Sequence, residues 1–212
     1  MSTEMKMSEV PFVGDTMPKL RAAAVQTAPV FLNRDATIEK MAAKTKEAKE
    51  NGADIVVFPE SFVPTFPLWC LFMPPVDQHP FYKRLFENAV AVPSPAFYRI
   101  ARIARENKIF LSVGICEKSN DTFGTMWNSN LLFDCEGNLI GHHRKLLPTW
   151  GEKLVWSFGD GSTLNVHDTE IGRIGALICG ENSNTLARYS LVAQGEQLHI
   201  GIYPPTWPTQ RP

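Results

Sequence analysis

Residues 20–27 read LRAAAVQT and residues 54–58 read DIVVF, and these two apolar runs determine the kind of fold that we expect. Continuous apolar runs of this length are typical of strands buried on both faces. Between them, Asn33 or Asp35 can cap a helix that continues to about Glu50. A strand, a helix and a second strand with short connections favour neighbouring parallel strands covered by helices. The sequence therefore predicts an α/β fold.

The same kind of pattern continues along the rest of the chain. The residues from Pro64 to Pro80 include five prolines and many aromatic side chains, which indicates a long irregular loop. Asp134 to Asn138 forms the turn of an expected hairpin. We expect further helices over 95–107 and 183–194, and further strands over 109–116, 126–133, 139–144, 162–166, 171–178 and 198–203. These elements predict a mixed sheet.

Length, charge and cysteine content limit the class of protein. The 212 residues are enough for one large domain, and 21 basic against 22 acidic residues give a net charge of −1. This balance argues against nucleic-acid binding of the usual basic kind, and no basic run favours a membrane surface. No apolar stretch approaches the roughly 18 residues that span a bilayer. The four cysteines lack zinc-site spacing, so we expect free thiols and no metal.

The two ends of the chain differ from its middle. Residues 1–18 mix charges, Pro and Gly with single hydrophobic residues, which is typical of a mobile leader and unlike a signal peptide. We therefore expect a cytoplasmic protein with its domain over 19–212. The strand over 198–203 is followed only by a Pro-rich segment, although a buried strand needs cover on both faces. We expect the domain to be truncated at its C-terminus, and the chain alone to be oligomeric or aggregation-prone and to have weak or no activity.

Cys179 is the first candidate for a chemical role. It follows the apolar run 174–178 and is followed by Gly180-Glu181-Asn182 and a helix. A nucleophile at a sharp turn from strand to helix is exposed beside backbone N–H groups, which favour a thiolate and can stabilise an oxyanion. The alternative is a buried structural cysteine.

Two further residues follow predicted strands. Glu60 comes directly after DIVVFP, and the carboxyl edge of a sheet is where α/β proteins place their sites. It is either a general base or a solvated carboxylate. Lys145 follows the hairpin strand 139–144 and is either a site residue or part of a surface basic cluster.

Three motifs containing these residues occur in a familiar order. Phe58-Pro59-Glu60, Arg144-Lys145-Leu146-Leu147-Pro148 and Leu177-Ile178-Cys179-Gly180-Glu181-Asn182 together resemble the nitrilase branch of the carbon-nitrogen hydrolase superfamily. The resemblance extends from about Lys19 to Trp207. It implies that Glu60 is the base, Lys145 the cation, Cys179 the nucleophile and Glu152 a second active-site glutamate. It also implies an α-β-β-α sandwich, helix-mediated pairing into homo-oligomers, and no cofactor. Members of the family continue well beyond residue 212.

The resemblance leaves several functions open. The preferred one is hydrolysis of a small organic nitrile to the carboxylic acid and ammonia through a covalent thioimidate and thioester on Cys179. An amidase or N-carbamoyl amide hydrolase would use the same three residues, and a hydratase-like outcome would stop at the amide. A truncated, inactive assembly subunit is the alternative outside the enzymes. The aromatic segment 62–80 either shapes the mouth of the pocket, which would suggest an apolar substrate, or packs in the core.

Overall fold

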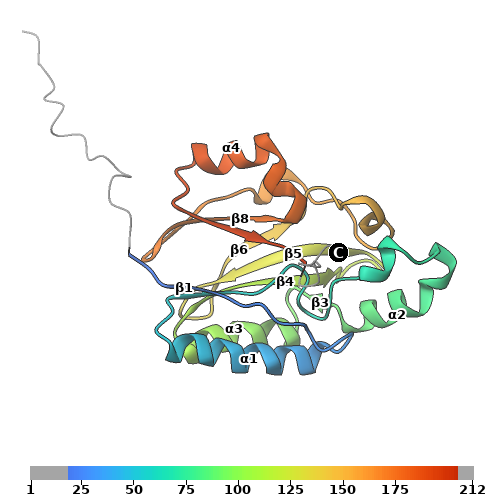
Figure 1. Cartoon of the computed structure of the whole chain (residues 1–212), viewed down its shortest axis with the longest axis horizontal. Coiled ribbons are helices and arrows are strands. Elements are labelled where there is room, and N and C mark those ends of the chain that lie inside the picture. The colour runs from blue at the N-terminus through green and yellow to red at the C-terminus, as the bar shows by residue number, and fades with distance from the viewer. Residues whose placement is uncertain (1–18, 205–212) are drawn as a thin grey trace, which may run out of the picture.

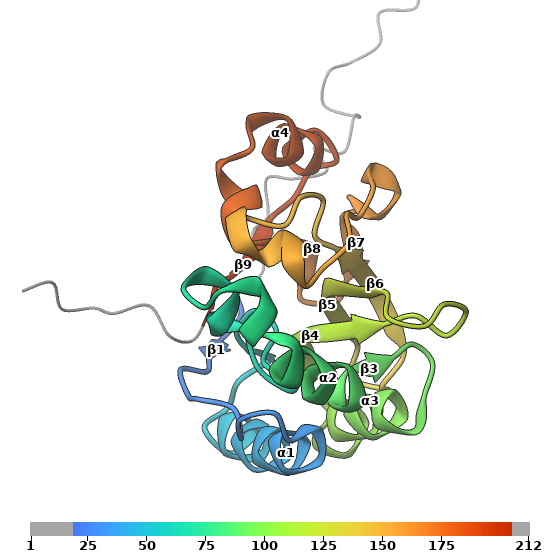
Figure 2. The same cartoon turned by 90° about the vertical axis from the view of Figure 1, so that its right-hand side faces the viewer.

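The computed structural model describes residues 19–204, and the expected leader 1–18 lies outside the described residues, as does 205–212. Within the described part, a six-stranded sheet has the order β1-β2-β4-β5-β6, with β3 paired to β4, and a second sheet has the order β7-β8-β9. Helices α1 and α3 cover the outer face of the larger sheet, and α4 covers the smaller sheet (Figure 1). Figure 2 shows the same layers from the side.

The elements have the following bounds. The helices are α1 (Arg34–Glu50), α2 (His79–Asn88), α3 (Pro95–Asn107) and α4 (Thr185–Ala193). The strands of the larger sheet are β1 (Ala22–Ala24), β2 (Ile55–Val57), β3 (Val90–Ala91), β4 (Phe110–Lys118), β5 (Met126–Phe133) and β6 (Leu139–Arg144). Those of the smaller sheet are β7 (His167–Thr169), β8 (Gly172–Ile178) and β9 (Leu198–Ile202).

Three apolar clusters hold the four layers together. The first lies between the α1–α3 pair and the larger sheet and includes Ile38, Ile100 and Leu111. The second lies between the two sheets, where Phe110, Leu132 and Ile55 meet Ile174, Ile178, Ile200 and Ile202. The third joins β8 to α4 through Leu177, Ala187 and Leu191. Side chains alternate between the two faces of a strand, so Leu177 of β8 packs in the third cluster and its neighbour Ile178 packs in the second. The expected α-β-β-α sandwich is confirmed.

The helices begin where the capping residues predict. Asn33 accepts a hydrogen bond from the backbone N–H of Ala36, 3.1 Å away, at the start of α1. Ser94 accepts one from the N–H of Phe97 at 3.2 Å, and Pro95 occupies the first turn of α3, where its missing N–H costs nothing. No helix within residues 19–204 is both long and apolar enough to cross a bilayer.

Two predicted segments were wrong. The expected strand over 162–166 is instead a 3₁₀ helix, Gly161–Thr163, which Asp160 caps by accepting from the N–H of Ser162, and the strand follows as β7. The expected loop 64–80 includes two 3₁₀ helices and the start of α2. Helix α2 is not predicted from the sequence because Pro80 suggests a loop, although proline also fits the first turn of a helix, where it lies here.

The aromatic side chains of that segment mostly serve packing. Phe62 lies in the first cluster, between the α1–α3 pair and the larger sheet, while Phe66, Trp69 and Cys70 form a fourth cluster with Trp156. Of the two interpretations of residues 62–80, the structure favours core packing for these buried members. Leu71, Phe72 and Val76 stay exposed.

The strand directions bring the candidate site to one edge of the larger sheet. Strand β2 is parallel to β4, β4 is antiparallel to β5, and β5 is antiparallel to β6. Strands β2 and β6 therefore point the same way, and the residues after their carboxyl ends meet. Gly114 in β4 permits this arrangement, because a Cβ atom there would clash with the backbone of Pro59, Glu60 and Ser61.

Candidate active site

Glu60 and Lys145 are fixed at this edge by their backbones. The N–H of Glu60 donates to the carbonyl oxygen of Tyr203 at 3.0 Å, just beyond β9. The N–H of Lys145 donates to the carbonyl oxygen of Asn128 at 2.8 Å, which extends the β5–β6 pairing by one bond. Backbone hydrogen bonds to segments of both sheets thus fix the Cα positions of Glu60 and Lys145.

The Lys145 side chain lies between two carboxylates. Its Nζ donates to Glu60 Oε1 at 2.8 Å and to Glu152 Oε2 at 2.7 Å. All three side chains are at least 96% buried. Each of these buried charges needs the opposite charge beside it, because burying an ionised group without a partner costs a large desolvation free energy.

Glu152 belongs to a 3₁₀ helix, Trp150–Leu154. Its Oε2 also accepts a hydrogen bond from the backbone N–H of Thr149 at 2.8 Å. The carboxylate therefore lies within hydrogen-bond reach of Lys145, as a second active-site glutamate requires. Its role in the reaction stays a prediction.

Cys179 follows β8 directly and begins a 3₁₀ helix, Cys179–Ser183. Its φ is +52°, in the left-handed region that side chains other than glycine rarely adopt. Ser61, next to Glu60, has φ +48°, and Trp150, close to Glu152 in the chain, has φ +46°. Backbone of this kind concentrates at functional sites, where the surrounding structure holds it. The strained turn expected at Cys179 is present.

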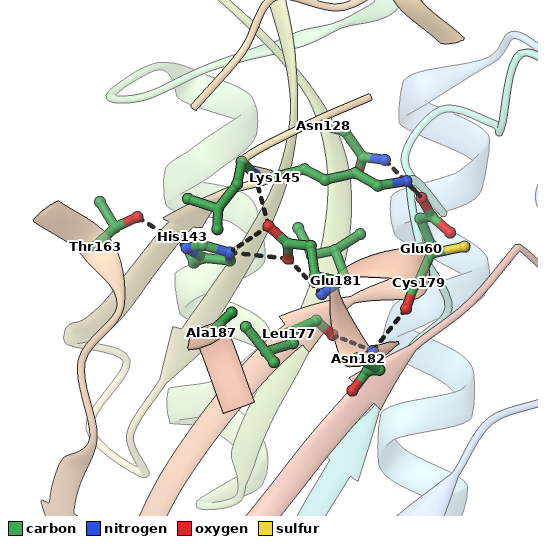
Figure 3. A network of polar contacts seen from close by, with 12 residues as sticks. Glu60, Asn128, His143, Lys145, Thr163, Leu177, Cys179, Glu181, Asn182 and Ala187 are labelled. Carbon is green, nitrogen blue, oxygen red and sulfur yellow. Dashed lines mark hydrogen bonds and ion pairs between the residues drawn. The ribbon is translucent and has the colours of Figure 1, made fainter. Parts of the chain in front are cut away.

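The thiol of Cys179 lies beside the Glu60 carboxylate (Figure 3). Within residues 19–204, Glu60 Oε2 is buried and has no hydrogen-bond partner. It is the oxygen not engaged by Lys145, and it is available to a proton from the thiol. The predicted residues Glu60, Lys145, Glu152 and Cys179 are thus brought together.

Burial and charge set the protonation states. Burial raises the pKa of Glu60 more than the Lys145 ammonium lowers it. For Lys145, burial would lower the pKa, but the carboxylates of Glu60 and Glu152 more than offset this and raise it. Burial, followed by the charge on Glu60, raises the pKa of the Cys179 thiol to about 12. The expectation that helix-start N–H groups favour a thiolate was therefore wrong for the resting site, because desolvation and the carboxylates outweigh them.

These directions predict the pH dependence of any reaction that uses Glu60 as base. The acid limb of kcat/KM should lie above the ordinary glutamate value of 4.5, because Glu60 must be ionised and its pKa is raised. No alkaline limb should occur up to pH 9, since the pKa of Lys145 lies above 10.5 and that of Cys179 is about 12. A pH–rate profile measures both limbs. An acid limb at or below pH 4.5 would contradict the prediction.

Asn128 is a site residue that the sequence analysis missed. Its Nδ2 donates to Glu60 Oε1 at 2.7 Å, and the side chain is buried in β5 (Figure 3). A sequence signal was present, because Asn128, Ser129 and Asn130 form a polar run inside an otherwise apolar strand. Buried polar side chains need partners, so such a run indicates a polar site on one face of the sheet.

A hollow of about 610 Å³ opens beside Cys179. It is lined by Cys179, Gly180, Asn182, Ser183, Tyr203 and Pro204. None of the residues 62–80 lines it, so the predicted contribution of that segment to the mouth is not found in this hollow. The four cysteines are free thiols, as expected.

A buried Glu-Lys-Glu cluster beside a cysteine on a strained turn, in an α-β-β-α sandwich, is the arrangement of the thiol-dependent hydrolases indicated by the sequence motifs. Residues 21–212 match the carbon-nitrogen hydrolase family, and the chain belongs to that family. The family predicted from the three motifs is confirmed.

Single proteins within the family are also similar to this chain. The chain is 42% identical over 190 residues to Nitrilase 3 of an unknown prokaryotic organism, covering 89% of this chain and 57% of the relative. It is 35% identical to a bifunctional nitrilase/nitrile hydratase of Nicotiana tabacum, covering 86% of this chain and 53% of the relative. It thus spans about half the length of these curated relatives. The crystal structure of an amidase from Nesterenkonia sp. has the same fold, with a TM-score of 0.68 at 18% identity over 90% of this chain and 67% of the amidase.

Proposed function

We propose that the protein hydrolyses a small organic nitrile to the carboxylic acid and ammonia, with Cys179 as nucleophile. The observation that carries this proposal is the contact of the Cys179 thiol with a buried glutamate whose other oxygen is bonded to Lys145. A thiol with a pKa of about 12 is not ionised at neutral pH, so its attack requires a base in contact. Glu60 is that base.

The first half of the reaction forms a covalent intermediate. Cys179 Sγ bonds to the nitrile carbon while its proton passes to Glu60 and from there to the nitrile nitrogen, which gives a thioimidate. The ammonium of Lys145 stabilises the negative charge that develops on nitrogen. Because Lys145 is desolvated and held by two carboxylates, it needs little rearrangement to do so.

The second half uses two waters. Glu60 removes a proton from the first water as it adds to the thioimidate and passes it to nitrogen. The proton of the added hydroxyl then follows to nitrogen, the C–N bond breaks, and ammonia leaves, which gives a thioester. The second water, activated in the same way, releases the carboxylic acid and restores the thiol. Glu152 fixes Lys145 and raises the pKa of Glu60 by its charge. No step requires a metal or a cofactor.

The choice of nitrile over amide is supported by the relatives named nitrilase and by the Cys-Gly-Glu-Asn segment at 179–182. An amide product is a second candidate because one relative is named a bifunctional nitrilase/nitrile hydratase. Ammonia and amide release should be measured with aliphatic, aryl and arylacetonitriles and with the matching amides. Hydrolysis of the amides alone would replace the nitrilase proposal by an amidase. A chain that neither turns over any substrate nor labels at Cys179 with an electrophile would support the assembly subunit.

We also propose that the protein forms homo-oligomers in the cytoplasm. The four free cysteines support the reducing compartment. The outer surface of α4 supports self-association, because Leu186, Tyr189 and Val192 follow one another at a spacing of three and are 80%, 68% and 55% exposed.

Tyr189→Glu should therefore weaken self-association of the 212-residue chain by at least tenfold, since it places a charge in the apolar surface of α4. Sedimentation velocity across a concentration series measures this. Tyr98→Glu on α3 is the matched control, because Tyr98 is 61% exposed on the opposite outer layer. Equal effects of the two variants, or a monomeric wild type at micromolar concentration, would contradict the α4 interface.

A further inference from the structure

Glu181 is a buried carboxylate for which the proposed reaction has no use. It lies two residues after Cys179 in the 3₁₀ helix Cys179–Ser183 and is 5% exposed. It does not line the hollow beside Cys179, and its carboxylate points toward His143 (Figure 3). A group buried at this cost must be held by specific partners.

The partners of Glu181 adjoin two of the proposed catalytic residues. Its Oε1 accepts from the backbone N–H of Leu146 at 2.5 Å, and its Oε2 accepts from the backbone N–H of Ile178 at 2.7 Å. Leu146 directly follows Lys145, and Ile178 directly precedes Cys179. One carboxylate thus joins the chain beside Lys145, at the end of the larger sheet, to the chain beside Cys179, at the end of the smaller sheet.

His143 completes the set of donors. Its Nε2 lies 3.0 Å from Glu181 Oε2 and 3.2 Å from Oε1, and its Nδ1 lies 2.8 Å from Thr163 Oγ1. A neutral imidazole satisfies all of these contacts if Nε2–H donates to the carboxylate and Nδ1 accepts from the hydroxyl. The carboxylate therefore has three donors, two from residues 143–146 at the end of β6 and one from the end of β8 (Figure 3).

We propose that Glu181 is a positioning residue that sets the distance between the Cys179 sulfur and the Lys145 ammonium. The proposal rests on the proposed function, in which both groups act on one reacting centre. A misplacement of about 1 Å in such a pair can reduce the rate by about 10²-fold. A purely structural Glu181 would stabilise the fold equally but would leave this distance to other contacts.

Glu181→Gln tests the proposal because the amide presents an NH₂ group to a donor that the carboxylate had accepted from. We expect kcat for nitrile hydrolysis to fall by at least tenfold with KM changed less than threefold, since Glu181 does not line the hollow. The matched control is Glu117→Gln. Glu117 is equally buried and accepts from Ser129 Oγ at 2.5 Å and Arg144 Nε at 3.2 Å, with His142 Nε2 at 2.8 Å, but it binds no backbone beside Cys179.

A second readout does not need turnover. Phenylacetaldehyde can add to the Cys179 thiol, with a C–S bond forming and the thiol proton passing to the carbonyl oxygen, which gives a tetrahedral thiohemiacetal. Its oxygen occupies the place where Lys145 stabilises charge. Calorimetry should give a dissociation constant at least tenfold weaker in Glu181→Gln, within twofold of wild type in Glu117→Gln, and no binding in Cys179→Ala. Thermal unfolding of each variant shows the accompanying loss of stability.

The outcomes separate the two proposals. Wild-type aldehyde affinity in folded Glu181→Gln, or equal weakening in Glu117→Gln at equal loss of stability, would overturn the positioning role. If Glu181→Gln does not fold, His143→Gln decides: it removes the imidazole donor, and an aldehyde affinity less than threefold weaker than wild type overturns the proposal. Aldehyde binding without hydrolysis of any nitrile would remove the proposed function and leave Glu181 to be judged by the binding data. A wild type that neither binds the aldehyde nor hydrolyses any nitrile would overturn both.

Discussion

Replacing Cys179 with alanine should reduce nitrile hydrolysis by at least about 10⁴-fold, because losing a covalent nucleophile leaves only the catalysis due to binding and charge. The fold should persist, since the side chain is only half-buried and small. Mass spectrometry of the wild type quenched during turnover should show an adduct on Cys179 that is absent from the variant. Ammonia release measures the loss of rate.

The other cysteines supply the controls for this experiment. Cys135 lies in the β5–β6 turn and is half-buried like Cys179, so Cys135→Ala should keep full activity. Cys116 is buried and accepts a hydrogen bond from the Trp156 indole at 3.2 Å. Cys116→Ala should therefore lower the melting temperature without a specific loss of rate. Full activity in Cys179→Ala would refute the proposed mechanism.

The second large effect concerns the buried ion pairs. Glu60→Gln and Lys145→Ala should each reduce kcat by about 10² or more, because one removes the base and the other the charge that stabilises the developing anion. Their effects on stability should differ. The amide oxygen introduced by Glu60→Gln can still accept from Lys145 and Asn128, whereas Lys145→Ala leaves two carboxylates buried without a cation, at a cost of about 3–5 kcal/mol until one takes up a proton.

Kinetics and thermal unfolding of the same preparations separate these contributions. Glu152→Gln is a useful third variant, because it keeps Lys145 paired with Glu60 and removes one of the two anions. We expect Glu152→Gln to reduce kcat less than Glu60→Gln does. Near-normal turnover in either Glu60→Gln or Lys145→Ala would remove that residue from the site.

Local patterns in the sequence predicted most of the fold. The capped helices α1 and α3 and the hairpin β5–β6 follow from signals within a few residues, such as Ser94-Pro95 and the turn after Phe133. The α2 helix was missed because its start lies among prolines, and β7 was misplaced because the Asp160 cap favours a turn. In both places a single polar or proline residue outweighs the apolar pattern.

The candidate site was predicted less from local pattern than from three motifs in a fixed order. Strand ends identified Glu60 and Cys179 as candidates, but nothing near them in the chain indicates their partners. The contact of Asn128 with Glu60 and those of Glu181 with Leu146 and Ile178 depend on how the two sheets are stacked. Such contacts are set by tertiary packing, which spacing along the chain does not encode.

The bond from the Glu60 N–H to the Tyr203 carbonyl has a consequence for the order of folding. The site depends on contacts between segments far apart in the chain, since the Lys145–Glu60 ion pair alone spans 85 positions. Contacts of such long range form slowly, because the entropy of closing the loop is lost before the contact stabilises anything. The helical layer and the β5–β6 hairpin can therefore form while Cys179, Glu60 and Lys145 are still apart. A synthesised chain acquires its complete site only when β9 has left the ribosome and docked.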